Sequence, residues 1–192
     1  MTDLKLDARR TALVVIDLQQ GILAAEREPH SPAAVVARSA ALARAVRDAG
    51  GQVVFVRVAF ARDYGDTLKQ PTDEPLVRPS GGLPDAWSQL APELDIQPAD
   101  LVVTKRQWGA FYGTGLELEL RRRGLTTMVL CGIATNYGVE STARDGWERG
   151  FDILFAEDAM TSSPPGAHEF AVRTVFPRIG RVRSTADILA AL

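Results

Sequence analysis

The sequence is poor in the side chains that build disulfides and transition-metal sites. Its 192 residues include one cysteine, Cys131, and two histidines, His30 and His168. One cysteine cannot form a disulfide within the chain, and a chain of this length does not need one to bury a stable core. The histidines show none of the close spacings, such as HxxxH, that bind zinc or iron. We therefore expect no metal and no cofactor, with His30 solvated in a loop and His168 packed in a late helix.

Charge of one sign and long apolar runs are also absent. Lysine and arginine number 22 against 24 acidic residues, a net charge of −2, which gives no electrostatic reason to bind nucleic acid. The first residues, MTDLKLDARR, lack the apolar region of a signal peptide, and no spanning segment follows nearby. We expect one cytoplasmic domain, residues 1–192, that binds a small-molecule substrate and neither nucleic acid nor a membrane.

What the sequence does contain is an alternation of apolar strands and helical patterns. The expected strands are nearly continuous in apolar character, as in strands buried on both faces. They cover 11–17, 52–58, 100–105, 126–133, 151–158 and 180–184. The expected helices cover 32–50, 115–124, 136–150, 166–176 and 185–192. Repeated strand–helix units predict a three-layer, doubly wound α/β fold, a mostly parallel six-stranded sheet with helices on both faces.

In such a sheet, ligands bind beyond the carboxyl ends of the strands. Asp17 and Lys105 each close a predicted strand, and the turn 131–136 closes another. A carboxylate at the end of an apolar strand is costly to desolvate unless it is paired, and Lys105 can supply the cation. The couple is either a structural ion pair or a catalytic pair with shifted pKa values. The irregular segment 60–99 is expected to shape the binding site.

The helix after this turn contains an unexpected glycine. Thr135 or Asn136 is the expected N-cap, which would point the first backbone N–H groups and the positive end of the helix dipole into the cleft. Glycine in a first helical turn costs up to about 1 kcal/mol relative to alanine, so Gly138 indicates a need for space or close approach. The residues expected on the packed face of this helix are Val139, Thr142, Ala143, Gly146 and Trp147.

Three motifs together resemble the isochorismatase-like hydrolases, also called the cysteine hydrolase superfamily. The motifs are ALVVIDLQQGIL, TKRQWGAFYGTGLELELRRRG and VLCGIATNYGVESTARDGWERGF. The likeness covers nearly the whole chain and is closest to an uncharacterised bacterial branch with KRQWGAFYGT and TNxGVESTAR. It implies the same three-layer fold, a hydrolase, and a homo-oligomer, commonly a dimer or a tetramer.

The resemblance also implies roles for individual residues. Asp17 takes the place of the family's acid/base, Lys105 that of its lysine, and Gly138 that of its cysteine nucleophile, which is therefore missing. The family's non-proline cis peptide corresponds to Ile133–Ala134 and would direct the Ala134 amide at the ligand. Metal-binding nicotinamidases of the family carry a histidine-containing ligand set after the second strand. The corresponding VAFARDYGD has no histidine, which argues against that activity.

Further side chains near the motifs are candidates for substrate contact. The alternative role for Gln19 is that of a polar residue at the start of a helix. The alternative role for Trp108 is packing in the core or at a subunit contact. True isochorismatases hold substrate carboxylates with Gln and Arg after the second strand, whereas this chain offers Arg62 and Arg57 there. The predicted substrate-binding residues are Gln19, Phe60, Trp108, Ala134 and Tyr137.

Three functional hypotheses follow. Isochorismatases lack the cysteine and cleave a vinyl ether to pyruvate and a dihydroxy-cyclohexadiene acid. In that chemistry a protonated Asp17 would donate to the methylene carbon, and Lys105 would help to hold the carboxylate. The second hypothesis is an amidase that uses Cys131, although a thiol within an apolar strand end has a raised pKa. The third is a catalytically silent member that binds a ligand. We predict the first, an acid-catalysed hydrolase of a small carboxylate-bearing metabolite.

Overall fold

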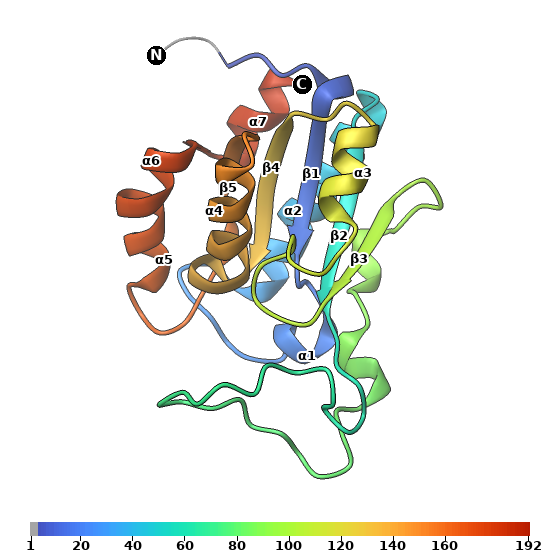
Figure 1. Ribbon diagram of the computed structural model, residues 1–192. Coiled ribbons are helices and arrows are strands. Elements are labelled where there is room, and N and C mark those ends of the chain that lie inside the picture. Colours follow the sequence, from blue (N-terminus) through green and yellow to red (C-terminus); the bar gives the residue numbers. More distant parts are fainter. Residues whose placement is uncertain (1–3) are drawn as a thin grey trace.

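A parallel sheet runs through the centre of the computed structural model, which describes residues 4–192 (Figure 1). The sheet has six strands in the order β3-β2-β1-β4-β5-β6. All neighbouring strands are parallel. The strands are β1 Thr11–Ile16, β2 Gln52–Val58, β3 Leu101–Lys105, β4 Thr127–Ile133, β5 Asp152–Thr161 and β6 Arg181–Arg183. The predicted three-layer α/β fold is confirmed.

Helices connect the strands along the chain. The α-helices are α1 Gln20–Leu23, α2 Pro32–Asp48, α3 Leu116–Arg122, α4 Glu140–Glu148, α5 Ala167–Phe170, α6 Phe176–Ile179 and α7 Thr185–Ala191. Two π-helical turns extend this set, η4 Thr135–Val139 before α4 and η5 Ala171–Val175 between α5 and α6. Short 3-10 turns cover Ala8–Arg10, Asp85–Ser88 and Pro92–Leu94.

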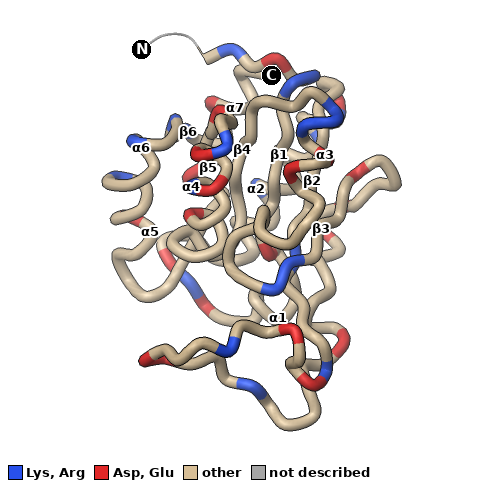
Figure 2. The backbone as a smooth tube through the Cα atoms, viewed as in Figure 1, with Lys and Arg blue, Asp and Glu red and all other residues tan. Residues whose placement is uncertain are grey.

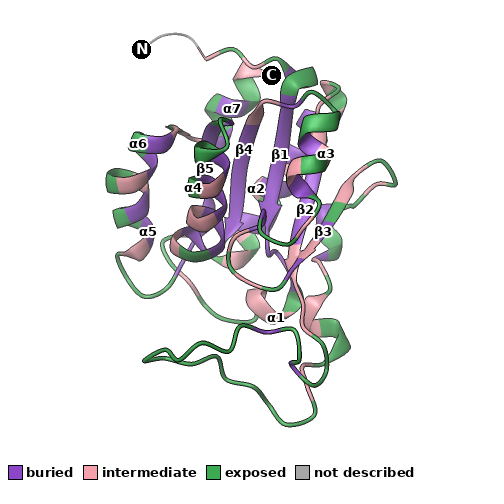
Figure 3. Ribbon diagram, in the orientation of Figure 1, coloured by how far each residue is buried: buried purple, intermediate pink, exposed green. Residues whose placement is uncertain are grey.

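The sheet separates two hydrophobic cores. Leu13 and Val15 of β1 join the core beneath α2 and α7, whereas Val14 and Ile16 join the core beneath α3, α4 and α6. Successive strand residues point to opposite faces, so β1 must be apolar throughout to serve both cores. Figure 3 shows the central strands buried along most of their length, whereas the edge strand β3 is largely intermediate or exposed. Burial of each such side chain contributes about 1.5–3 kcal/mol to the free energy of folding.

Only the strand 52–58 has its predicted bounds; three of the other five differ by a single residue, and a structural cause is evident at the carboxyl ends of β1 and β5. β1 ends at Ile16 because Asp17 has a positive φ of 52° and leaves the extended conformation. The predicted strand 151–158 continues to Thr161. The pairing register between β4 and β5 shifts near Gly132, so that Met160 pairs with Gly132 and the strand is prolonged.

The segment between β2 and β3 is the longest irregular part of the described chain. It lies beyond the carboxyl ends of the strands, at the bottom of Figure 1, and most of it is exposed (Figure 3). Its return is fixed to the β1–α1 connection, because the Gln20 amide donates to the Gln89 carbonyl at 2.8 Å and the Ala91 amide donates to the Leu18 carbonyl at 2.9 Å. The returning part of the segment therefore lies in space beside the residues that directly follow Asp17, at the edge where a ligand is expected.

Acidic and basic residues are interspersed along the described backbone (Figure 2). This distribution agrees with the net charge of −2. Among residues 4–192, no helix has the length and apolar character needed to cross a membrane.

Candidate active site

Asp17 and Lys105 meet at the carboxyl edge of the sheet. Lys105 ends β3 and pairs in register with Val58 of β2, while the Asp17 amide donates to the Val56 carbonyl of the same strand. The lysine side chain is long enough to cross the end of β2, and its Nζ lies 2.8 Å from Asp17 Oδ2. The structure thus brings together two of the predicted catalytic residues as a direct ion pair.

This ion pair is almost completely removed from water. Asp17 is 5 % exposed and Lys105 2 %, and Asp17 Oδ1 has no hydrogen-bond partner. Burial raises the pKa of Asp17 to about 6, although the charge and hydrogen bond of Lys105 act in the opposite direction. Lys105 Nζ also donates to the Trp108 carbonyl. More of such a carboxyl is protonated near neutral pH than of an ordinary aspartate.

Gly138 lies directly against the ion pair. A Cβ built at this position would be 3.2 Å from Asp17 Oδ2, 3.2 Å from Lys105 Nζ and 2.9 Å from Ile16 Cγ2. The last of these distances is shorter than real Cβ contacts, so even alanine would require Ile16 to move. Because Gly138 has no side chain, its backbone can lie close to Asp17 and Lys105. This is the close approach that a glycine in a first helical turn led us to expect.

The turn before this helix is held tightly against β1. Gly132 has a φ of 114°, and a Cβ there would be 2.1 Å from the Ile16 carbonyl oxygen, so only glycine fits. The next peptide, Ile133–Ala134, is a non-proline cis bond, as the resemblance implied. These features bring the end of β4 beside the residue that precedes Asp17.

The predicted N-cap is wrong. The helical segment begins at Thr135, its N-cap is Ala134, and no side chain makes a capping hydrogen bond. Thr135 Oγ1 lies 2.9 Å from His168 Nδ1 instead, and Asn136 Oδ1 accepts a hydrogen bond from Ser162 Oγ. Both side chains are directed toward α5 and the end of β5, contacts between distant segments that local helix rules do not anticipate.

The packed face of α4 matches the prediction except at its end. Val139, Thr142, Ala143 and Gly146 are buried, but Trp147 is 50 % exposed. The buried positions recur at helical spacing, and residue 147 falls at the margin of that stripe. Trp147 is therefore a surface residue and not a core residue.

Gln19 is fully buried, and backbone groups use its amide. Its Nε2 donates to the carbonyls of Val58 and Trp87, and its Oε1 accepts from the Val58 amide at 2.8 Å. These contacts join the β1–α1 connection to β2 and to the irregular segment. Both amide protons are used, which favours the structural alternative for Gln19 over substrate contact.

Aromatic side chains lie near this edge of the sheet. The rings of Trp108 and Tyr137 lie 4.8 Å apart and are 62 % and 38 % exposed as residues. Phe60 is partly buried, with its ring 6.5 Å from that of Tyr64. Sequence reasoning did not single out Tyr64, whose buried hydroxyl has no partner. A bound molecule can satisfy such a group, so we add Tyr64 to the candidates.

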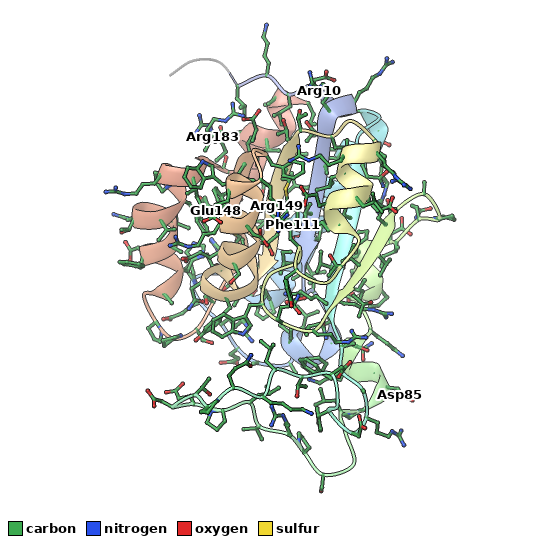
Figure 4. All side chains as sticks on the ribbon, viewed as in Figure 1. Arg10, Asp85, Phe111, Glu148, Arg149 and Arg183 are labelled. Atoms are coloured by element: carbon green, nitrogen blue, oxygen red, sulfur yellow. The ribbon has the colours of Figure 1, made fainter. Side chains whose placement is uncertain are left out.

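The two arginines expected near a substrate carboxylate have other contacts. Arg57 Nε donates to Thr104 Oγ1 across the β2–β3 pair at 3.1 Å. The Arg62 side chain is 79 % exposed and lies 4.0 Å from Asp85, at the outer part of the irregular segment (Figure 4). Neither is buried with Asp17 and Lys105.

Cys131 belongs to the opposite core. It is fully buried on β4 beneath α2, and its sulfur accepts a hydrogen bond from Ser39 Oγ at 3.4 Å. Burial raises the pKa of its thiol to about 12. A thiolate, the nucleophilic form, is therefore absent at neutral pH.

A second cluster of ionisable side chains lies away from the ion pair. His30, Glu157 and His168 place their potential ligand atoms within 4.8 Å of one another. His30 is half-buried rather than solvated, because its ring packs edge-on against that of His168 at 5.9 Å. The argument against a metal from histidine spacing along the chain therefore does not hold in three dimensions.

Comparison with known proteins identifies the family. The isochorismatase domain model matches residues 11–187. The chain belongs to the isochorismatase family. This confirms the predicted family and, because members of the family are hydrolases, the predicted class of enzyme.

Individual members of the isochorismatase family resemble the chain over nearly its full length. An uncharacterised family protein, YecD of Escherichia coli, is 51% identical over 98% of this chain and 100% of its own length. The ureidoacrylate amidohydrolase RutB of Methylorubrum extorquens is 32% identical over 97% of this chain and 84% of its own. A solved family structure from Burkholderia thailandensis has a TM-score of 0.93 and 45% identity, covering 100% of this chain and 99% of its own.

Proposed function

We propose that this isochorismatase-family hydrolase works without a covalent thiol intermediate, by acid-catalysed hydrolysis of a small, carboxylate-bearing enol ether. One observation carries the proposal. A buried carboxyl, Asp17, has a pKa raised to about 6 and faces a position, Gly138, that has no side chain. By resemblance, Gly138 occupies the place of the family's cysteine nucleophile. The site therefore retains an acid and a lysine but lacks a nucleophile.

The proposed reaction uses the proton of Asp17. The protonated carboxyl donates to the methylene carbon of an enolpyruvyl group, which leaves an oxocarbenium ion at the ether carbon. Water adds to that carbon and returns a proton to Asp17. The resulting hemiketal collapses to pyruvate and an alcohol, so that one water is consumed and no enzyme bond forms. Burial favours this chemistry because it keeps part of the carboxyl protonated near neutral pH.

Lys105 and the helical turn hold the substrate in this proposal. An ammonium group has three N–H donors, and Asp17 and the Trp108 carbonyl accept two of them. The third donor is assigned to the substrate carboxylate, together with the backbone N–H groups at the start of η4. The neighbouring rings of Trp108 and Tyr137 supply apolar surface for the remainder of a small substrate.

The competing functions differ in the nucleophile they need. An amidase reaction of the kind named for RutB would have to use Cys131, whose thiol is buried in the other core with a pKa raised to about 12. A catalytically silent member would bind a ligand at the same edge without turnover. The acid-catalysed hydrolase is favoured over the silent member because the raised pKa of Asp17 suits a group that transfers a proton. A protein that only binds a ligand has no use for that shift.

The test is turnover of isochorismate, with released pyruvate followed by a coupled assay. The wild-type chain should release pyruvate, and Asp17→Asn should lower kcat/KM by at least about 100-fold, since general acid catalysis contributes about 10²–10⁴-fold. Asn keeps the shape of the side chain and can still accept a hydrogen bond from Lys105, but it removes the charge that pairs with this buried lysine. A circular dichroism spectrum and melting curve of the variant therefore accompany the assay, and only a folded variant is compared with wild type. The matched control is Asp85→Asn, because the Asp85 side chain is 93 % exposed at the rim of the irregular segment (Figure 4) and should leave the rate unchanged.

Two outcomes would contradict the proposal. Equal rates for wild type and Asp17→Asn would show that Asp17 is not the acid. Ligands that raise the melting temperature of the wild-type chain, combined with no turnover of any enol ether or amide, would favour the silent binding member.

A further inference from the structure

Tertiary contacts assemble the second cluster, and these contacts fix its geometry. The loop before α2 is attached to the end of β5 by a two-way backbone bridge, in which Glu28 and Ser162 exchange amide hydrogen bonds of 3.2 and 3.1 Å. This bridge holds His30, two residues after Glu28, beside β5. Glu157 lies on β5 itself, and His168 lies on α5. The cluster therefore joins three segments that are far apart in the sequence.

His168 is oriented for an incoming ligand. The imidazole Nδ1 is 2.9 Å from Thr135 Oγ1, and its Nε2 is 4.0 Å from Glu157 Oε2. Histidines that bind metals use one ring nitrogen for the ion and the other for a hydrogen bond that fixes the ring. His168 is only 6 % exposed as a residue, so the packing around it holds the ring in this orientation.

We propose that His30, Glu157 and His168 bind one divalent transition-metal ion, with Zn²⁺ as the ion whose preferred ligands they match. Two imidazoles and one carboxylate are a ligand set that Zn²⁺ accepts together with water. The set lies on other elements than Asp17, Lys105 and Gly138, and none of its members has a part in the proposed hydrolysis. The site stands whether or not that hydrolysis is confirmed.

The observed separations are close to those a metal needs. Zn²⁺ binds imidazole nitrogen and carboxylate oxygen at about 2.1 Å, which places two tetrahedral ligands about 3.4 Å apart. The ligand atoms here lie within 4.8 Å of one another. Binding therefore requires the side chains to close by at most about 1.4 Å. His30 and Glu157 are only half-buried and can make this adjustment by rotation.

An ion can reach the cluster from solvent. Glu157 and His168 line a surface hollow of about 750 Å³ whose rim also includes Glu28, Glu169 and Asp187. These acidic groups attract cations, although Arg173 and Arg183 on the same rim reduce the effect. The hollow thus supplies the entry path that a metal site requires.

The first experiment measures Zn²⁺ affinity by calorimetry on the untagged full-length chain after removal of metals with a chelator. Wild type should bind one ion per chain. His30→Ala and Glu157→Gln should each weaken binding by at least about 10-fold, because even outer-shell substitutions cost about 10–100-fold. Glu169→Gln is the matched control: this carboxylate lines the same hollow but pairs with Arg173 at 3.0 Å, and its loss should leave the affinity unchanged.

The second experiment uses the fact that the chain has only two histidines. Imidazole nitrogen spectra should show both rings responding to a single equivalent of Zn²⁺ and neither responding to Mg²⁺. The proposal is overturned if no stoichiometric binding occurs, or if His30→Ala and Glu157→Gln bind as tightly as wild type. It is equally overturned if only one ring responds, since that result identifies adventitious binding at a single histidine.

Discussion

At Asp17 two opposing effects act on one carboxyl group. Burial disfavours its ionised form, while Lys105 at 2.8 Å favours it, and burial prevails, so the pKa rises to about 6. From sequence alone both effects were evident but their balance was not. The balance depends on how completely the strand ends exclude water, which only the packed structure determines.

The raised pKa of Asp17 predicts the pH dependence of activity. A general acid must be protonated, and the carboxyl is protonated below its folded-state pKa of about 6. Hence kcat/KM for an enol ether should be greatest below about pH 6 and fall about tenfold per unit above it. The measurement is a pH–rate profile of pyruvate release. A rate that rises through pH 6 would instead identify Asp17 as a base.

Thiol chemistry provides a second prediction at the residue scale. Cys131 in the folded chain should resist iodoacetamide at pH 7.5 and react only after unfolding, because burial raises its pKa to about 12. Gly138→Cys requires Ile16 to shift, because the new Cβ would lie 2.9 Å from Ile16 Cγ2. In the folded variant the new thiol should react, since its Cβ would lie 3.2 Å from Lys105 Nζ and a neighbouring cation favours a thiolate. Mass spectrometry distinguishes the two sites, and rapid labelling of Cys131 in the native wild type would contradict the assignment.

At the scale of elements, the seam between β1 and β4 positions the site. β4 approaches β1 closely enough at Gly132 that no other residue fits, and the chain then turns through Ala134 into the helical segment that contains Gly138. The sequence predicted the strand and the helix. It placed the helix start wrongly, because Thr135 contacts His168 of α5 and Asn136 accepts a hydrogen bond from Ser162, just after β5, instead of capping the helix.

This seam can be tested with two glycines that share a positive φ. Gly150→Ala should cost about 1–2 kcal/mol of unfolding free energy, because Gly150 has a φ of 79° but open space around it. Gly132→Ala should cost at least about 3 kcal/mol, since its Cβ would also collide with the Ile16 carbonyl oxygen. Urea unfolding of both variants measures the difference, and equal losses would refute the close approach of the two strands.

At the scale of the whole molecule, exposed aromatic residues collect on one side of the sheet. Trp108 and Tyr112 precede α3, Tyr137 and Trp147 lie in η4 and α4, and Phe170 lies in α5. These elements cover the same face of the sheet (Figure 1). Exposed apolar surface of this kind is typical of protein interfaces.

We expect this face to contribute to a homo-oligomer. Light scattering during gel filtration should give a mass two or four times the 20.8 kDa of one chain. Trp108→Ser combined with Trp147→Ser should shift the mass toward the single chain if these residues form the contact. A wild-type mass of one chain would contradict the prediction.

The sequence by itself determined the α/β fold with its mostly parallel sheet, the order of strands and helices along the chain, and the family. It also identified the strand ends where Asp17 and Lys105 lie, because apolar periodicity and short motifs are local properties of the chain. Only the tertiary structure decided that Gln19 is used by the backbone, that Trp147 is exposed, that Cys131 faces the opposite core, and that His30, Glu157 and His168 meet. These outcomes depend on contacts between segments distant in sequence, and on how fully those contacts exclude water, neither of which local spacing specifies.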